Sequence, residues 1–125
     1  MIPENLKYTK DHEWVLLDGD TITMGITNHA QSELGDITFV ELPDLDTEVS
    51  KGDELCTIES VKAAADVFAP INGTVCTINE SLEDEPEKLN QSPYTEGWIC
   101  KLNNIDTKEV SNLMDATAYQ NFIDA

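Results

Sequence analysis

The stretch that decides the fold is Glu59-Ser60-Val61-Lys62-Ala63-Ala64-Ala65-Asp66. Its composition alone favours a helix, because Glu, Lys and Ala all have high helix propensity. An isolated helix of about eight residues would be marginal in water, however. Strand-like residues stand on both sides, at 57–58 and 67–68, and Pro70 follows. The flanks therefore favour a β-hairpin with Lys62 at its tip, although the residues alone leave the helix open.

Lys62 is the candidate functional residue of this stretch. It is one of only seven basic residues, against 25 acidic ones, and three alanines follow it directly. A modifying enzyme can reach such an amine, and a group attached to it can swing freely. A free lysine amine has a pKa near ~10.4, so a modifying ligase has to deprotonate it or supply an activated group. We therefore expect Lys62 to be a covalent attachment point on a rigid mount.

Length and charge bound the class of protein. A chain of 125 residues is expected to form a single domain. The net charge is −18 and the chain contains no arginine, so nucleic acid and anionic membranes are poor partners. An acidic surface steers association with basic protein surfaces, or it simply keeps the protein in solution. We expect protein partners and a monomer.

The three cysteines, Cys56, Cys76 and Cys100, are widely spaced, and no C-x-x-C pair is present. We interpret them as small core residues in a reducing compartment, and we expect no metal site. His12 and His29 are expected at the surface or at strand ends. The N-terminal sequence lacks the pattern of a signal peptide, so the cytoplasm of a bacterium is the expected location, with a mature mitochondrial form as the alternative.

The rest of the chain predicts short strands separated by turns. Asp18-Gly19-Asp20 and Asn72-Gly73 are typical of hairpin turns. Strands are predicted at 13–17, 21–26, 36–42, 55–60, 65–69, 74–78 and 97–102. Such a pattern favours a sandwich or barrel.

Helices or single helical turns are predicted at five places. A helix at 28–34 would be capped by Asn28 and ended by Gly35. Helical turns are expected after Ser81 and from Pro86. Two C-terminal helices, the first begun by a capping box of Asp106 and Glu109 and the second capped by Asp115, would pack against one edge or end of the sheets.

The residues around Lys62 resemble a lipoyl-type carrier domain and, more narrowly, the H-protein family of the glycine cleavage system. The similar segments run in family order from about residue 6 to residue 123. Besides 59–63 and 70–75, they are His12-Glu13-Trp14, Gly25-Ile26-Thr27, Ala30-Gln31, Leu34-Gly35-Asp36, Phe39-Val40-Glu41-Leu42-Pro43, Asn90, Ser92-Pro93-Tyr94, Glu96-Gly97-Trp98 and Ala118-Tyr119. Each is weak alone, but their order and spacing together are specific. The resemblance implies one lipoyl-carrier domain over 1–125, with its core at about 6–123.

The implied fold is mainly β, a lipoyl-domain-like barrel-sandwich hybrid of short antiparallel strands, with short helices that include a C-terminal segment. The implied function is that of a carrier without catalytic residues. Lipoate in amide linkage on Lys62 would take an aminomethyl group from glycine decarboxylase (P protein) to an aminomethyltransferase (T protein). Dihydrolipoamide dehydrogenase (L protein) would reoxidise the arm, and a lipoate ligase or lipoyltransferase would attach it.

Three further residues are carried over from the family by position. Glu13 and Asp66 match residues near the cleft in which the arm rests, where carboxylates would hold its cationic end. Glu59 matches the acidic residue that the lipoylating enzyme reads. The alternative for Glu13 and Asp66 is an ordinary solvated carboxylate, and the alternative for Glu59 is a residue on the surface of a strand. Many family members have glycine where this chain has Asp46, so the turn there is expected to differ locally.

Three other functions stay open. The chain could be a lipoyl-relay protein that donates lipoyl groups to other enzymes, or a carrier domain of a 2-oxoacid dehydrogenase complex. A biotin carrier fits poorly, because such domains place Met on both sides of the lysine, where this chain has Val61 and Ala63. A small enzyme that uses a cysteine with a histidine is the reading from another class, and no local pattern supports it.

Overall fold

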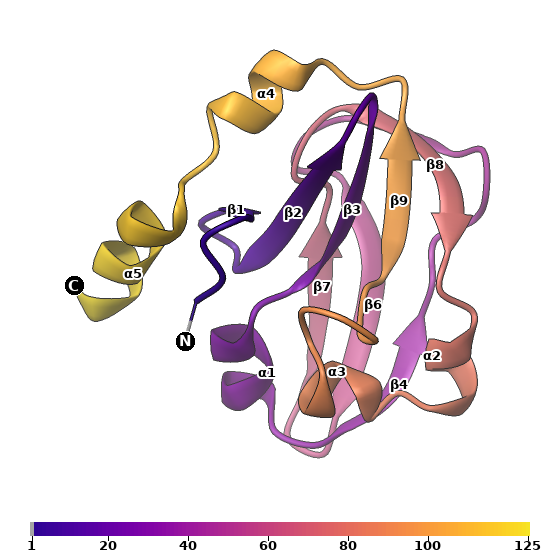
Figure 1. Cartoon of the computed structure of the whole chain (residues 1–125). Helices are drawn as coiled ribbons and strands as arrows, with labels where there is room; N and C mark the ends of the chain where they lie inside the picture. Colours follow the sequence, from indigo (N-terminus) through magenta and orange to yellow (C-terminus); the bar gives the residue numbers. More distant parts are fainter. Residues whose placement is uncertain (1) are drawn as a thin grey trace.

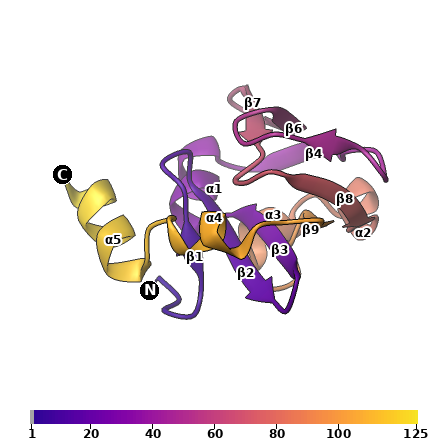
Figure 2. The same ribbon diagram turned by 90° about the horizontal axis from the view of Figure 1, so that it is seen from above.

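Two antiparallel sheets make up most of the protein. The computed structural model describes residues 2–125. One sheet has six strands in the order β1-β2-β3-β9-β8-β5, and the other has three in the order β4-β6-β7. The larger sheet contains β1 (Lys7–Tyr8), β2 (Glu13–Asp18), β3 (Thr21–Ile26), β5 (Glu48–Val49), β8 (Gly73–Ile78) and β9 (Cys100–Asn103), and the smaller contains β4 (Ile37–Glu41), β6 (Glu54–Ser60) and β7 (Ala64–Phe68). Seen from above, the smaller sheet lies on one side of the molecule and β1, β2 and β3 on the other (Figure 2).

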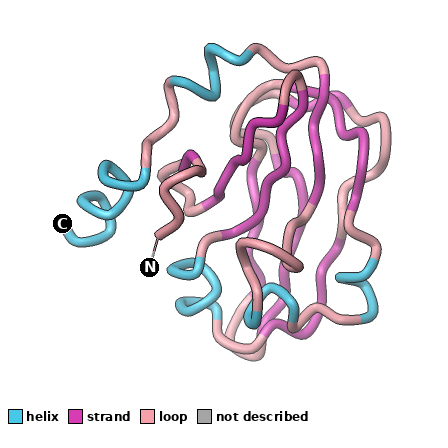
Figure 3. The backbone as a smooth tube through the Cα atoms, viewed as in Figure 1, coloured by secondary structure: helices cyan, strands magenta, loops and turns pink. Residues whose placement is uncertain are grey.

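In the described part of the chain, five short helices join and flank the sheets. They are α1 (Asn28–Leu34), α2 (Ser81–Asp84), α3 (Lys88–Gln91), α4 (Thr107–Ser111) and α5 (Ala116–Asp124). Figure 3 shows α1, α2 and α3 at one end of the sheets and the two C-terminal helices apart from them. The turn between β6 and β7 lies at the same end as α1 and α3 (Figure 1). A mainly β protein with short helices confirms the class predicted from the sequence.

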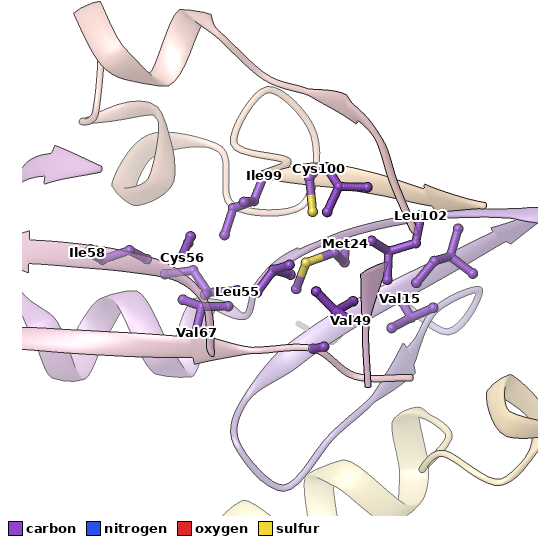
Figure 4. Close-up of a cluster of buried hydrophobic side chains, with 14 of the residues drawn as sticks. Val15, Met24, Val49, Leu55, Cys56, Ile58, Val67, Ile99, Cys100 and Leu102 are labelled. Atoms are coloured by element: carbon purple, nitrogen blue, oxygen red, sulfur yellow. The ribbon is translucent and has the colours of Figure 1, made fainter. Parts of the chain in front are cut away.

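The core lies between the inner faces of the two sheets. Val15, Met24 and Leu102 come from the larger sheet, and they face Leu55 and Val67 of the smaller one (Figure 4). All five side chains are buried. Burial of a side chain of this size contributes about 1.5–3 kcal/mol, so this contact between sheets holds the mount rigid.

Two predicted turn motifs have different outcomes. Asp18-Gly19 joins β2 to β3 as a hairpin, and Gly19 has the positive φ (64°) that such turns require. The hairpin predicted at Asn72-Gly73 is wrong, because β8 pairs with β5 and β9 and not with β7. Asn72 instead fixes a crossing between sheets: its side chain accepts a hydrogen bond from Lys51 N at 2.7 Å.

The sequence predicted that Gly73 is a turn glycine, but the structure shows that it is required for close packing. A Cβ placed on it would lie 3.0 Å from the carbonyl oxygen of Asn103 and 3.1 Å from Leu102 Cβ. The close approach of β9 therefore excludes a side chain at this position.

Helix α1 has the predicted bounds but a different cap. Thr27, and not Asn28, is the N-cap, and its hydroxyl accepts a hydrogen bond from Ala30 N at 3.2 Å. The Asn28 side chain accepts instead from Gln31 Nε2 at 2.8 Å. Gly35 ends the helix as predicted, with φ 77°.

The C-terminal segment returns to the first strands. Asp106 and Asp115 cap α4 and α5 as predicted. Glu109 does not complete a capping box, because its carboxylate accepts from Asn72 N at 3.3 Å. Tyr8 and Met114 form an isolated antiparallel bridge, so α5 begins beside β1 (Figure 1). Asp46 has a positive φ of 67°, the conformation that glycine favours at that turn.

Candidate attachment site and adjoining cleft

The β6–β7 hairpin presents Lys62 at its tip. Glu59 pairs with Ala64, which leaves residues 60–63 as the turn. Ser60 N donates to the carbonyl of Ala63 at 2.8 Å. The Ser60 hydroxyl oxygen accepts from the backbone N of Lys62 and of Ala63, each at 3.2 Å. These bonds close the turn locally, so the hairpin prediction is confirmed and the helix suggested by propensity is wrong here.

The Lys62 side chain lies outside the core. It is exposed, and the neighbouring Val61 is 68% exposed. No ion pair within residues 2–125 involves Lys62. Its stem passes over Gly35: a Cβ placed on that glycine would lie 3.2 Å from Lys62 Cε and 3.7 Å from Nζ. An accessible amine without an ionic partner in this part of the chain is what covalent modification requires.

A cleft of about 320 Å³ lies between α1, the start of β2 and β7. Its apolar lining comes from Ile26, Ala30, Leu34, Ile58, Ala65 and Val67. Its polar lining comes from Asp11, His12, Glu13, His29, Glu33 and Asp66. An apolar surface with a few convergent polar groups is typical of a site for a small organic group.

The cleft begins close to Lys62 and extends along β7. Leu34 lines the cleft, and the stem of the Lys62 side chain lies against the next residue, Gly35. Further along β7, the backbone N of Phe68 donates to Glu13 Oε2 at 3.3 Å. Phe68 is four residues beyond Ala64, which corresponds to about 13 Å along a strand. A flexible chain attached to Lys62 can therefore lie along the cleft with its end near Glu13.

Glu13 is a buried carboxylate at this end of the cleft. It is 2% exposed, and its Oε1 accepts from the Thr9 hydroxyl at 2.5 Å. Burial raises the pKa of Glu13 to about 7, although the hydrogen bonds from Thr9 and Phe68 work in the opposite direction. Such a group changes charge near neutral pH and becomes a carboxylate when a cation lies against it.

The other two carried-over carboxylates lie in different surroundings. Asp66 lines the same cleft as Glu13, but it is exposed, and its Oδ1 accepts from the Thr57 hydroxyl at 3.3 Å. Glu59 is exposed on β6, opposite Ala64 on one side and Phe39 on the other. The fold thus brings Glu13 and Asp66 together and leaves Glu59 beside the attachment turn.

The sequence interpretation of the two histidines is incomplete, because both line the cleft. Their ring centroids are 4.6 Å apart. His12 Nδ1 lies 2.7 Å from Tyr119 Oη, and His29 Nε2 lies 3.3 Å from Glu33 Oε1. Burial and the neighbouring His29 lower the pKa of His12. The only signal in the sequence was the position of His12 directly before Glu13.

The three cysteines do not line this cleft. Cys56 and Cys100 are buried and Cys76 is half-buried, and all three are free thiols. Burial raises the pKa of Cys56 to about 12 and raises that of Cys100 as well. Within residues 2–125, no cluster of three or more His, Cys, Asp or Glu side chains has the arrangement of a metal site. The helices of the same region are all too short or too polar to cross a membrane.

Comparison with known proteins decides the family. The model of the glycine cleavage H-protein family matches residues 6–125. The chain belongs to the glycine cleavage H-protein family. It is 52% identical to the glycine cleavage system H protein of Chromohalobacter salexigens, over 99% of this chain and 95% of that protein. It is 54% identical to the probable glycine cleavage system H protein of Thermococcus gammatolerans, over 99% of this chain and 93% of that protein.

A solved structure of the H-protein family extends the agreement to the fold. The crystal structure of the Mycobacterium marinum H protein superposes with a TM-score of 0.89 at 32% sequence identity. The match covers 99% of this chain and 100% of that one. The resemblance drawn from the sequence is confirmed, and so is the lipoyl-domain-like barrel-sandwich fold. The chain is a carrier subunit of the glycine cleavage system.

Proposed function

We propose that Lys62 carries lipoic acid in amide linkage, and that 1–125 act as one lipoyl-carrier domain. The observation that carries the proposal is an exposed lysine at a hairpin tip, beside a cleft with a buried carboxylate. The amide removes the charge of the amine, so the attached arm begins at a neutral group. When bound, the lipoyl group supplies a disulfide that accepts an aminomethyl group and two electrons.

The cleft residues hold the end of this arm between reactions. Ile26, Ile58 and Val67 offer an apolar surface to its hydrocarbon part. Glu13 and Asp66 offer carboxylates to a cationic amine. Because Glu13 is 2% exposed, its attraction for a cation is weakly screened once it is ionised. Binding of the cation favours loss of the Glu13 proton, which is inexpensive for a group with a pKa of about 7.

The chain itself contributes tethering and not bond-breaking. An arm fixed on Lys62 meets successive active sites at a high effective concentration. We propose glycine decarboxylase, the aminomethyltransferase and dihydrolipoamide dehydrogenase as the enzymes it visits. Their own cofactors perform the chemistry. The raised thiol pKa of Cys56 gives no support to a cysteine nucleophile.

Attachment requires a lipoate ligase or lipoyltransferase, which we propose reads Glu59 beside the turn. The exposed Val61 and Phe39 are available to the same enzyme. A lipoyl-relay role would use the same lysine and turn, so it stays a second use of one site. The cytoplasm remains the predicted location.

The test is Lys62→Arg in glycine cleavage reconstituted from the carrier and its three enzymes. Arginine keeps the charge and the exposure but cannot form the amide, so we expect turnover to fall to the level without carrier. Lys51→Arg is the matched control, because Lys51 is also exposed and lies away from the turn. Turnover by the Lys62→Arg variant at the level of the control would refute the proposal.

A further inference from the structure

Tyr119 joins the C-terminal helix to the cleft. It is fully buried on α5, and its ring stacks on Tyr8 with centroids 4.7 Å apart. Its hydroxyl oxygen lies 2.7 Å from His12 Nδ1 and 2.8 Å from Thr27 Oγ1. His12 lines the cleft, and Thr27 caps α1, which forms one wall of it. One phenol thus touches two parts of the cleft, although α5 lies outside β1 at the edge of the molecule (Figure 1).

The hydrogen-bond partners of Thr27 determine which atoms donate. Thr27 is fully buried, and its hydroxyl oxygen already accepts from Ala30 N. Within residues 2–125, Tyr119 Oη is the acceptor that the Thr27 hydroxyl proton can reach. If Thr27 donates to Tyr119, the single Tyr119 proton is free to go to His12 Nδ1. Any reversal leaves the Thr27 proton buried without an acceptor, which is costly.

We propose that Tyr119 is a positioning residue that holds His12 neutral, with its ring proton on Nε2, so that the cleft presents no second cation to the charged end of the arm. The role toward the arm rests on the proposed function, whereas the tautomer of His12 does not. Protonation of His12 would place a donor on Nδ1 and break the chain of hydrogen bonds from Thr27. A protonated His12 would also repel a bound ammonium group.

Some groups around His12 lower its pKa and others raise it. The titratable groups near His12 come from four elements. They are Asp11 and Glu13 of its own segment, His29 and Glu33 of α1, Tyr119 of α5 and Asp66 of β7. Burial and His29 lower the pKa of His12, whereas Asp11 and Glu33 raise it. Because the pKa of His12 is lowered overall, its ring stays neutral through the usual titration range of histidine and becomes protonated only as the pH falls through the lowered value. Acidification is therefore expected to weaken the hold on a cationic arm.

The direct test is NMR of the His12 ring nitrogens in the ¹⁵N-labelled full chain, without lipoate. In the wild type we expect an Nε2–H tautomer and a pKa below that of an exposed histidine. Tyr119→Phe keeps the ring stack and removes the hydroxyl, so the two tautomers should mix and the His12 pKa should rise. An Nδ1–H tautomer in the wild type, or equal His12 pKa values in both proteins, would overturn the proposal.

Tyr94→Phe is the matched control. The Tyr94 hydroxyl accepts from Asn28 N at 3.0 Å, so this variant also removes a phenol bonded to α1 but leaves His12 untouched. The His12 pKa and tautomer should then match the wild type. A change in His12 as large as that in Tyr119→Phe would mean that any loosening of α1 suffices, and the specific role of Tyr119 would be wrong.

A second readout concerns the arm. The lifetime of the aminomethyl group on the loaded, lipoylated protein is followed by mass spectrometry between pH 6 and pH 8. For Tyr119→Phe we expect a lifetime several-fold shorter than the wild type at pH 6 and nearly equal to it at pH 8. Identical pH profiles would overturn the role toward the arm. Absence of lipoate from Lys62 would instead refute the proposed function and leave the NMR result standing.

Discussion

The hairpin tip and the Glu13 end of the cleft are built in opposite ways. At the tip, an exposed turn is closed by the backbone N and the hydroxyl of one residue, Ser60, and Lys62 lacks an ionic partner within residues 2–125. At the other end, Glu13, Thr27 and Tyr119 are buried, and their polar atoms bond to residues from several elements. The exposed tip is suited to presenting a group to other proteins, whereas the buried end is suited to binding a specific group.

This separation has a physical reason. An amine that must be modified and then swing has to be exposed, and exposed polar contacts contribute little to stability. A carboxylate that must select a cation gains strength from burial, because screening by water is weaker there. The same residues cannot satisfy both demands, and the proposed arm on Lys62 would bridge the two regions.

The largest expected effect on stability is at the buried end, for Glu13→Gln. Burial raises the pKa of Glu13 in the folded state to about 7, well above the ordinary value of a glutamate. The protonated Glu13 side chain therefore contributes fully to the free energy of unfolding at pH values below its pKa in the unfolded chain. This contribution is lost as the pH rises to the folded-state pKa of about 7. Glutamine mimics the protonated form and does not titrate. Between pH 5 and pH 8 the wild type should therefore lose roughly 2–3 kcal/mol in its free energy of unfolding relative to the variant. Urea unfolding at both pH values measures this.

Glu59→Gln is the control for that change, because Glu59 is exposed beside the tip. A substitution at such a position is expected to alter the free energy of unfolding by less than about 0.5 kcal/mol at either pH. If Glu13→Gln followed the wild type in parallel across this range, the carboxylate would not be titrating near neutrality.

Gly35→Ala tests the point where the two regions meet. Gly35 has φ 77° and ψ −159°, a conformation that is essentially restricted to glycine. The added methyl would also press on the Lys62 stem at 3.2 Å. We expect a loss of about 2 kcal/mol in thermal or urea unfolding, from backbone strain.

Gly19→Ala provides the comparison for this substitution. It too has a positive φ (64°), but nothing lies within 4 Å of the added Cβ. It should lose about 1 kcal/mol, the cost of the left-handed conformation alone. Equal losses in the two variants would show that Gly35 is not specially constrained.

Apart from the Glu59→Gln control, the smallest effect is expected at the tip itself, for Ser60→Ala. The variant loses the hydroxyl that accepts from Lys62 N and Ala63 N, but those groups are exposed and can bond to water. We expect a loss of about 0.5–1 kcal/mol in unfolding and faster amide exchange at Lys62 and Ala63. A loss as large as that of Gly35→Ala would mean that the tip is part of the stable core.

Sequence reasoning found the tip more easily than the cleft. Lys62 could be singled out from its neighbours, although local propensity favoured a helix and the resemblance favoured the hairpin. Pairing with β4 and β7 overrides that propensity, as tertiary contacts commonly do. Conversely, Asn72-Gly73 has the composition of a hairpin, but composition does not say which strand will be the partner.

The cleft was largely invisible because three distant segments build it. His12 and Tyr119 are separated by 107 positions along the chain and meet at 2.7 Å. No spacing rule links them, and each residue is unremarkable in its own segment. The cap of α1 shows the same limit on a smaller scale: Thr27 and Asn28 are both good caps, and the contact with Tyr119 involves only Thr27.

The central claim, that Lys62 is the attachment point, is tested most directly by intact mass followed by tandem fragmentation. The protein is produced with lipoate and a lipoate ligase. We predict the added mass of one lipoyl group, located by the fragments on Lys62. A lipoyl group on any other lysine, or a protein that stays unmodified while a known carrier in the same mixture is lipoylated, would contradict the account.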